Sequence, residues 1–184
     1  MNAPLPLATR LQLPRHYRVT HADTTTRADA LRLRRAVFCD EQGLFAGDDV
    51  DAIDAHAITL VARPVLNETD DALGPVVGTV RIHRLESHLW QGSRLAVAAE
   101  FRRIGAIGGA LIQLAVRSAN TLGCERFVAQ VQERNVPLFE RLHWRSVDAI
   151  TLHGQPHRLM EAELAHYPAY AADEAMQVEL RRGR

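Results

Sequence analysis

Short stretches in which apolar and polar residues alternate recur along the chain, and this is the pattern of strands that bury one face. Elsewhere apolar residues repeat at helical spacing, as do Ala30, Leu33 and Val37. A longer run of this kind extends from Ile104 to Leu122. The patterns predict strands over residues 16–20, 56–62, 76–85, 93–97, 126–132, 146–152 and 158–164, and helices over residues 29–42, 104–122 and 135–142.

Capping and turn residues predict where these elements end. Thr26 is a candidate N-cap for the first helix, with Asp29 three residues later as a weak capping box. Gly43 and Gly123 are candidate stops for the first two helices. The sequence HGQPH at residues 153–157 contains Gly and Pro, so it predicts the turn of a hairpin between the last two strands.

The order of the predicted elements indicates the fold class. A strand and a helix are followed by three strands, a helix, a strand, a helix and a hairpin, which predicts a mixed α/β sheet covered by helices. We expect one domain over residues 16–165, between an N-terminal arm over 1–15 and a C-terminal tail over 166–184. Pro64 is expected to end the second strand, and residues 67–74 to form a loop.

Composition narrows the class of protein. The chain has 184 residues, of which 22 are Lys or Arg and 22 are Asp or Glu, so no overall charge favours nucleic acid or an anionic membrane. Cys39 and Cys124 stand far apart and indicate reduced thiols rather than a disulfide framework. No apolar stretch is long enough to span a bilayer. We therefore expect a cytoplasmic protein that binds neither nucleic acid nor membrane.

One loop carries recognisable chemistry. Two arginines and three closely spaced glycines come together just before and within the start of the longest helix. The first N–H groups of a helix lack intrahelical acceptors and lie at the positive end of its dipole, and glycines let an anion approach the backbone. The loop therefore predicts a phosphate or pyrophosphate site that includes Arg102, Arg103, Gly105, Gly108 and Gly109.

Other glycine-rich motifs fit this loop less well. A P-loop needs Lys and then Ser or Thr after its last glycine, but Ala110 and Leu111 follow Gly109. A dinucleotide-binding fingerprint needs G-x-G-x-x-G in an early βαβ unit, and the run from Gly105 to Gly108 lacks its first spacing. The remaining alternative is that the glycines only allow close packing of a helix on a strand.

The loop resembles the acetyl-CoA motif Q/R-x-x-G-x-G/A of the GNAT superfamily. One register begins at Arg102 and another at Arg103, and each departs from the motif at one position, so both stay open. Three further stretches resemble the superfamily in the expected order: 31–43 with 48–54 (LRLRRAVFCDEQG and DDVDAID), 76–81 (VVGTVR) and 135–144 (NVPLFERLHW). The resemblance spans residues 16–165 and includes features of a bacterial subfamily, the nitrogen-starvation N-acetyltransferases.

The resemblance implies a GNAT fold of the α/β (α+β) class, with about six or seven mostly antiparallel strands, two of them splayed apart, and about four helices. It implies acetyl-CoA as cosubstrate, no metal, and direct transfer of the acetyl group in a ternary complex to a primary amine of a small molecule or peptide. Relatives often dimerise through a sheet edge, so a homodimer is also expected. The positions implied to hold acetyl-CoA are Leu95, Ala96, Val97, Arg102, Arg103, Ile104, Gly105, Ala106, Ile107, Gly108, Gly109, Asn135 and Phe139.

The sequence departs from the family at both acid–base positions. The strand that carries a Glu base in many relatives corresponds to residues 90–97, which contain no carboxylate, and Phe139 stands where many relatives have a Tyr acid. Other residues must then accept the proton and bind the acceptor. The candidates for the base are Glu86, His83 and Glu133, and the candidates for acceptor binding are Glu41 and His153.

Some features keep alternative explanations. His153 and His157 are four residues apart, but Gly154 and Pro156 exclude a helix, so a turn is favoured over a metal pair. The acidic run at 48–54 is expected to be a solvated loop; beside an acceptor cleft it would favour a cationic amine. Rival functions are a non-catalytic acetyl-CoA-binding regulatory module and a relative of the acyl-homoserine-lactone synthases.

Overall fold

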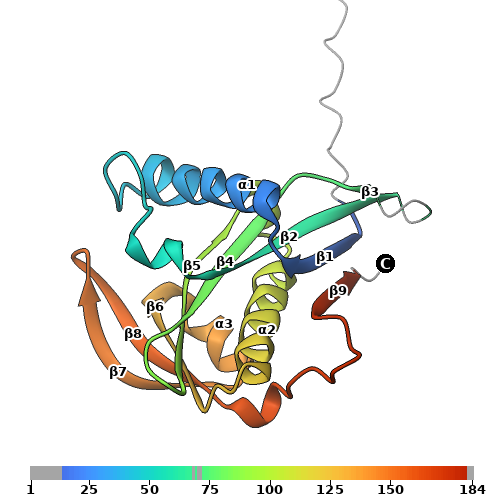
Figure 1. The fold of residues 1–184 in the computed structure, drawn as a ribbon. Coiled ribbons are helices and arrows are strands. Elements are labelled where there is room, and N and C mark those ends of the chain that lie inside the picture. Colours follow the sequence, from blue (N-terminus) through green and yellow to red (C-terminus); the bar gives the residue numbers. More distant parts are fainter. Residues whose placement is uncertain (1–13, 68, 70–71, 182–184) are drawn as a thin grey trace, which may run out of the picture.

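A nine-stranded sheet runs through the computed structural model, which describes residues 14–67, 69 and 72–181 (Figure 1). Residues 1–13 of the predicted N-terminal arm lie outside the described residues. The strands are β1 (His16–His21), β2 (Ile58–Asn67), β3 (Ala72–Leu73), β4 (Gly78–Arg84), β5 (Leu89–Val97), β6 (Arg126–Gln132), β7 (Trp144–Leu152), β8 (Gln155–Ala162) and β9 (Gln177–Arg181).

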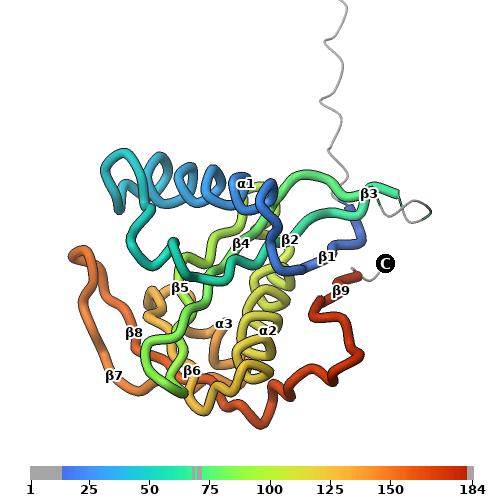
Figure 2. Tube along the Cα trace, in the orientation of Figure 1, coloured from blue at the N-terminus to red at the C-terminus, as the bar shows by residue number. Residues whose placement is uncertain are grey.

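The strand order is β7-β8-β6-β5-β4-β2-β1-β9, with β3 paired to β2. Every neighbouring pair is antiparallel except β5 and β6. Parallel neighbours need a crossover connection, and helix α2 (Ala106–Thr121) provides it. Figure 2 follows the chain from β5 through α2 to β6. The one parallel pair therefore lies at the centre of the sheet, beside the start of α2.

Helix α1 (Thr24–Arg35) begins before the predicted helix. Its N-cap is Asp23, whose carboxylate accepts the Thr26 N–H at 2.8 Å while the Asp23 N–H donates to the Thr26 hydroxyl at 3.0 Å. Thr26 is thus the third helical residue of a capping box and not the N-cap, because the first turn is polar and shows no apolar repeat. The chain continues into a π-helical turn, Ala36–Glu41, and Gly43, with φ of 61°, ends it as predicted.

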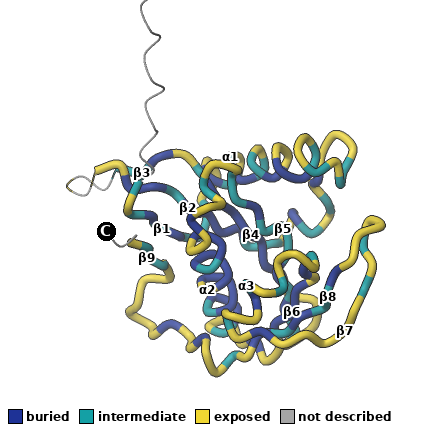
Figure 3. Tube along the Cα trace, turned by 180° about the vertical axis from the view of Figure 1, so that it is seen from behind, coloured by how far each residue is buried: buried dark blue, intermediate teal, exposed yellow. Residues whose placement is uncertain are grey.

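Helices α2 and α3 (Val136–Arg141) pack on the face of the sheet opposite α1 (Figure 1). Ile107, Leu111 and Leu114 of α2 are fully buried in the main core. Gly78 of β4 lies so close to α2 that a Cβ there would come within 3.0 Å of Leu111. Figure 3 shows the buried residues along α2 and the central strands.

Three predicted strand boundaries are corrected by the structure. Strand β2 runs through Pro64, whose carbonyl accepts the Gly74 N–H at 2.8 Å, so the missing N–H of proline does not end the strand. Strand β5 begins at Leu89 rather than at residue 93. The hairpin turn is only His153 and Gly154, with Leu152 and Gln155 already paired.

The predicted C-terminal tail contains β9, which pairs with β1 and so adds an edge strand to the sheet. Its apolar alternation covers only Val178 and Leu180, too few residues to predict a strand. The described residues therefore form nine strands, not six or seven, and three α-helices, not about four. The GNAT type of fold, with a mostly antiparallel sheet, is as the resemblance implied.

Candidate functional site

Strands β5 and β6 pair at one end only. Their parallel register runs from Leu89–Arg126 to Gly92–Ala129 and stops there, although both strands continue. Beyond that point β5 stays paired with β4 on one side, and β6 with β8 on the other. The splay implied by the resemblance is confirmed, and it leaves backbone groups of both strands facing the gap without strand partners across it.

A bulge at Arg94 accompanies the splay. Arg94 has φ of 55°, and the register between β4 and β5 shifts between Thr79 and Arg81. A bulge bends its strand and redirects a side chain. Here the Arg94 side chain lies on the α1 face of the sheet, where it contacts Asp49.

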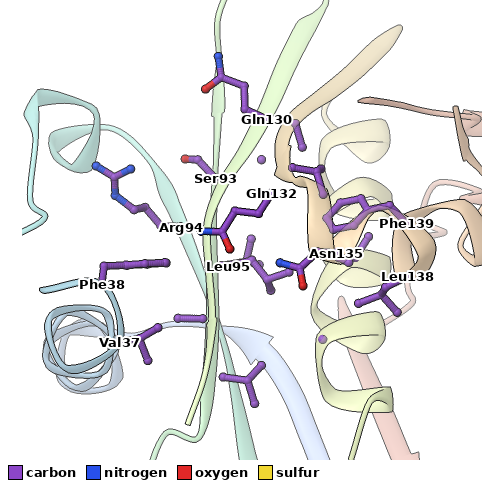
Figure 4. Close-up of a pocket in the computed structure, with 18 of the residues that line it drawn as sticks. Val37, Phe38, Ser93, Arg94, Leu95, Gln130, Gln132, Asn135, Leu138 and Phe139 are labelled. Carbon is purple, nitrogen blue, oxygen red and sulfur yellow. The ribbon is translucent and has the colours of Figure 1, made fainter. Parts of the chain in front are cut away.

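A cavity of about 540 Å³ fills the gap between the splayed strands. Figure 4 shows Phe38 and Arg94 on one side of β5, and Asn135, Leu138 and Phe139 on the other. We call these the α1 side and the α2 side of the cavity. The α2 side is bounded by the start of α2 and by α3; the α1 side is bounded by the π-helical turn, the loop after it and the tip of the β7–β8 hairpin. Two ligands entering from the two sides would meet in the gap.

The α2 side offers a place for an anion. Helix α2 has Gly105 as its N-cap, and no side chain among the described residues caps it. A Cβ on Gly105 would meet no atom within 4 Å, and a Cβ on Gly108 would meet only Leu138, at 3.8 Å. Both glycines line the cavity, so the open space beside them lies within it. The uncapped N–H groups and the helix dipole fit the pyrophosphate of CoA.

Nine of the thirteen positions predicted to hold acetyl-CoA line this cavity: Leu95, Ala96, Val97, Arg102, Ile104, Gly105, Gly108, Asn135 and Phe139. The other four do not. Arg103 is exposed, Ile107 is buried in the core, and Ala106 and Gly109 line a separate cleft. Arg102 and Gly105, which belong to the register that begins at Arg102, line the cavity, and so does Gly108, which belongs to the register that begins at Arg103. Neither register of the motif therefore fits in full.

Arg102 ties the end of β5 to the π-helical turn. Its Nη1 and Nη2 atoms contact the Glu41 carboxylate at 2.5 and 2.6 Å, and its Nε donates to the Val97 carbonyl at 2.8 Å. The hydrogen bonds from Arg102 lower the pKa of Glu41. Glu41, predicted to bind the acceptor, does not itself line the cavity; it contacts Arg102, which does.

Asn135 stands at the N-cap position of α3, as predicted, but its side chain makes no capping hydrogen bond. Figure 4 shows it in the gap, near Gln132 and Leu95. Its carboxamide is therefore available to a ligand. Phe139, also on the α2 side, packs edge-on against Trp144, with ring centroids 5.0 Å apart.

Aromatic rings and a guanidinium close the α1 side. The Arg94 guanidinium lies 4.4 Å from the centre of the Phe45 ring, and that ring lies 5.0 Å from the His153 ring. His153 and Gly154 have φ of 49° and 70° and form the two-residue turn of the hairpin, which corresponds to a type I′ turn. The hairpin tip thus reaches the loop after α1, and His153 lines the cavity as its predicted role requires.

A buried arginine of α1 organises the acidic run. Arg34 is 1% exposed; its Nε donates to Asp49 at 2.8 Å and its Nη1 to Asp54 at 2.6 Å. Burial alone would raise the pKa of Asp54, but hydrogen bonds from Arg34 outweigh that effect and hold its pKa well below the ordinary value. Asp49 and Asp54 are both buried, so the prediction of a solvated acidic loop is wrong for them, because arginines from other elements pair with them.

Two further arginines from the sheet complete this charge cluster. Arg81 of β4 contacts Asp51 at 2.6 Å and Asp54 at 2.7 Å. Arg94 of β5 contacts Asp49 at 2.9 Å and Asp51 at 3.2 Å. The three arginines cancel the formal charge of Asp49, Asp51 and Asp54, and the fourth aspartate of the run, Asp48, is exposed and does not line the cavity.

The three residues predicted as candidate bases lie away from the cavity wall. Glu86 is exposed in the connection between β4 and β5, and Glu133 is exposed and contacts Arg158 at 3.0 Å. His83 is 4% exposed on β4, with both ring nitrogens lacking a hydrogen-bond partner. No Asp or Glu is among the described residues that line the cavity, so a proton acceptor must come from the other residue types there.

His157 of β8 meets the geometric requirements of a base. It lines the cavity and is 7% exposed, and its Nδ1 lies 2.9 Å from the Gln155 carbonyl. A carbonyl can only accept, so Nδ1 carries the hydrogen and, in the neutral ring, Nε2 holds a free lone pair. His157 is the register partner of Gln132 at the splayed end of β6, so the two side chains share a face of the sheet. The sequence placed His157 only in a turn.

The buried His83 predicts a pH-dependent stability. Burial, and then the positive charge of Arg81, lower its pKa below the ordinary value of 6.5. As the pH falls below 6.5, His83 of the unfolded chain binds a proton more readily than His83 of the folded chain. The stability contributed by neutral His83 is therefore present above pH 6.5 and is lost as the pH falls below it. We expect the urea concentration at the unfolding midpoint to fall as the pH is lowered from about 7.5 to about 5. The variant His83→Leu should show a smaller fall, and its free energy of unfolding at the higher pH should be about 1 kcal/mol greater than that of the wild type. Exposed His88, changed to Gln, is the control; an unchanged slope in His83→Leu would contradict the assignment.

A possible metal-binding group lies elsewhere. Among the described residues, His143, Glu163 and His166 place one ligand atom each within 4.8 Å of one another, all three are exposed, and none lines the cavity. This group of three residues therefore has no part in the site.

None of the helices in the described part of the chain has the length and apolar character of a membrane span.

Comparison with known proteins shows the family of the chain. The sequence profile of the Acetyltransferase (GNAT) family matches residues 30–144, which include the π-helical turn, β5 and all of α2 and α3. Among curated proteins none matches the sequence significantly.

Solved structures share the fold at low sequence identity. A provisionally assigned N-acetyltransferase from Lactobacillus plantarum is 21% identical, with a TM-score of 0.68 over 79% of this chain and 97% of that chain. The CoA-dependent acyl-homoserine lactone synthase BjaI, with SAM and isopentyl-CoA, is 16% identical, with a TM-score of 0.60 over 79% of this chain and 82% of that one. An aminoglycoside 6′-N-acetyltransferase complexed with coenzyme A is 11% identical, with a TM-score of 0.61 over 78% of this chain and 94% of that one.

Proposed function

The chain belongs to the acetyltransferase (GNAT) family, and from that premise we propose that it is an N-acetyltransferase that uses acetyl-CoA and a primary amine. The observation that carries the proposal is the cavity between the splayed strands, which opens on the uncapped start of α2 at one side and on an aromatic, polar wall at the other. In this arrangement the pyrophosphate of CoA lies against Gly105 and Gly108 and its acyl end reaches the gap.

The chemistry asked of the protein is proton removal and positioning. A primary amine is mostly protonated at neutral pH, since a lysine-type amine has a pKa of about 10.4, and it must lose a proton before it attacks. The acceptor nitrogen then bonds to the acetyl carbon, the bond from that carbon to the CoA sulfur breaks, and the second proton that the nitrogen loses passes to the departing thiolate, which leaves as free CoA. We assign the first proton to Nε2 of His157, and assign the binding of the acyl end to Asn135 and the free backbone groups of β5. When bound, acetyl-CoA supplies the acetyl group as a thioester.

A pair of glycines in α2 tests the CoA site. Gly108 and Gly109 both lie in the first turn of the helix and both leave room for a methyl group, but only Gly108 lines the main cavity. We expect Gly108→Ala to weaken acetyl-CoA binding about tenfold, because the methyl group keeps a phosphate from the backbone and costs a charged hydrogen bond. Isothermal titration of purified protein with acetyl-CoA measures this.

Gly109→Ala is the matched control, and we expect it to bind as the wild type does. Both variants should unfold at the same or higher urea concentration, since Ala is favoured over Gly in a helix by about 1 kcal/mol. A loss of affinity in Gly108→Ala thus cannot come from unfolding. Failure of the wild type to bind acetyl-CoA would overturn the proposed function, and binding without release of free CoA with any amine would favour a non-catalytic regulatory module.

A further inference from the structure

We propose that the acceptor amine carries a carboxylate, which Arg94 binds on the α1 side of the cavity. This inference rests on the proposed function and adds the class of acceptor. It follows from three features of that side: the charges that line it, the unused hydrogen-bond donor of Arg94, and the position of the guanidinium over the Phe45 ring.

The charges that face the cavity are positive or can become so. The ionisable side chains among the described residues that line it are Arg94, Arg102, Arg134, His153 and His157. Asp49, Asp51 and Asp54 beside the α1 side are already paired with Arg34, Arg81 and Arg94, and neither Asp40 nor Asp48 lines the cavity. A polycationic acceptor would find no uncompensated carboxylate here, and its second ammonium group would be desolvated beside arginines.

Arg94 keeps donors for a ligand. Its hydrogen bonds use Nε and Nη2, which donate to the Asp49 carbonyl and to Asp51. Nη1 takes part in no hydrogen bond or ion pair within the described residues. A guanidinium holds its N–H groups in a fixed planar fork, so a carboxylate can bind Nη1 without releasing the two aspartates.

The electrostatic state of Arg94 differs from that of its neighbours. Burial, and then the charge of Arg81, lower the pKa of Arg94, whereas hydrogen bonds to aspartates outweigh burial and raise the pKa values of Arg34 and Arg81. The cation of Arg94 is thus the least compensated of the three. An added anion at the free Nη1 would stabilise this cation further.

The position of Arg94 places that anion on the α1 side of the cavity. Arg94 is adjacent in sequence to Leu95, which lies in the gap in Figure 4, while its guanidinium lies over the Phe45 ring on the α1 side. An acceptor held there by its carboxylate must then extend from the α1 side so that its amine reaches the gap and His157. The nearby arginine charge also lowers the pKa of the acceptor ammonium, which eases loss of its proton.

Matched pairs of amines test the inference. L-phenylalanine against phenethylamine, and L-lysine against cadaverine, differ only by the carboxylate. We expect the carboxylate-bearing member of each pair to bind at least about tenfold more tightly to protein saturated with CoA, by isothermal titration, and to give the higher kcat/KM by free-thiol release from acetyl-CoA.

Variants of Arg94 identify the residue responsible. Arg94→Met should remove the preference within each pair, while Arg94→Lys, which keeps the charge, should retain part of it. Arg84→Met is the control, since Arg84 is exposed over Trp90 and does not line the cavity. Unchanged acetyl-CoA affinity shows that each variant is folded.

The outcomes separate this inference from the proposed function. Acetyl-CoA binding by the wild type, with equal affinity or no measurable affinity for both members of each pair, overturns the carboxylate class and leaves the transferase proposal standing. A preference for cadaverine, or a preference that survives Arg94→Met, also overturns it. No acetyl-CoA binding at all would overturn both.

Discussion

Replacing His157 by Gln is expected to lower kcat for acetyl transfer by about a hundredfold or more, with acetyl-CoA affinity unchanged. Gln has a similar size and can still hydrogen-bond, but it cannot accept a proton. The effect should fall on kcat because His157 lies on β8, across the splay from the start of α2. Free-thiol release under saturating substrates, with titration of acetyl-CoA as a binding check, measures both quantities.

The choice of acceptor distinguishes a base from a packing residue. A weakly basic amine such as a hydrazide is already neutral at the assay pH, so its attack needs no prior proton removal. The deficit of His157→Gln should therefore shrink with such an acceptor. A matched change in the exposed hairpin tip, His153→Gln, should alter KM more than kcat, because His153 contacts Phe45 on the α1 side. An equal deficit with both kinds of amine would assign His157 a structural role only.

The sequence predicted the α2 side of the site better than the α1 side, for a physical reason. A helix start with Gly105 and Gly108 is local in sequence, so its anion site can be inferred from spacing alone. The family resemblance supplied the splayed strands, and the register of β5 and β6 confirmed them. In contrast, the tautomer of His157 depends on the Gln155 carbonyl, and its place in the cavity wall depends on the pairing of β8 with β6. No spacing in the sequence carries that information.

The acidic run at residues 48–54 shows the same limit, because the sequence does not reveal which arginines pair with its aspartates. Four aspartates within seven residues are typical of a solvated loop when read alone. Three of them, Asp49, Asp51 and Asp54, pair with arginines of α1, β4 and β5 that are distant in sequence. Only the tertiary structure brings them together, and it turns a segment expected to attract cations into a neutral support for Arg94.

That support should also be a main determinant of stability. Replacing Arg34 by Met removes one arginine partner of Asp49 and of Asp54 while keeping a chain about as long as the aliphatic stem of arginine. Because it leaves three aspartates against two arginines in this cluster, we expect the free energy of unfolding to fall by about 3–5 kcal/mol. Equilibrium unfolding in urea measures the change, and Arg35→Met, the exposed neighbour on α1, should change it by less than about 0.5 kcal/mol.

A second substitution tests the cause of that loss. If uncompensated charge is responsible, Asp54→Asn in the Arg34→Met background should restore part of the stability, although Asp54→Asn alone destabilises the protein. If the two losses simply add, then the charge pairing of Arg34 with Asp54 is not the cause of the loss. The first result would show that Arg34 and Asp54 stabilise the fold as a charge pair, so that ion pairs hold the wall beside Arg94 before any acceptor arrives.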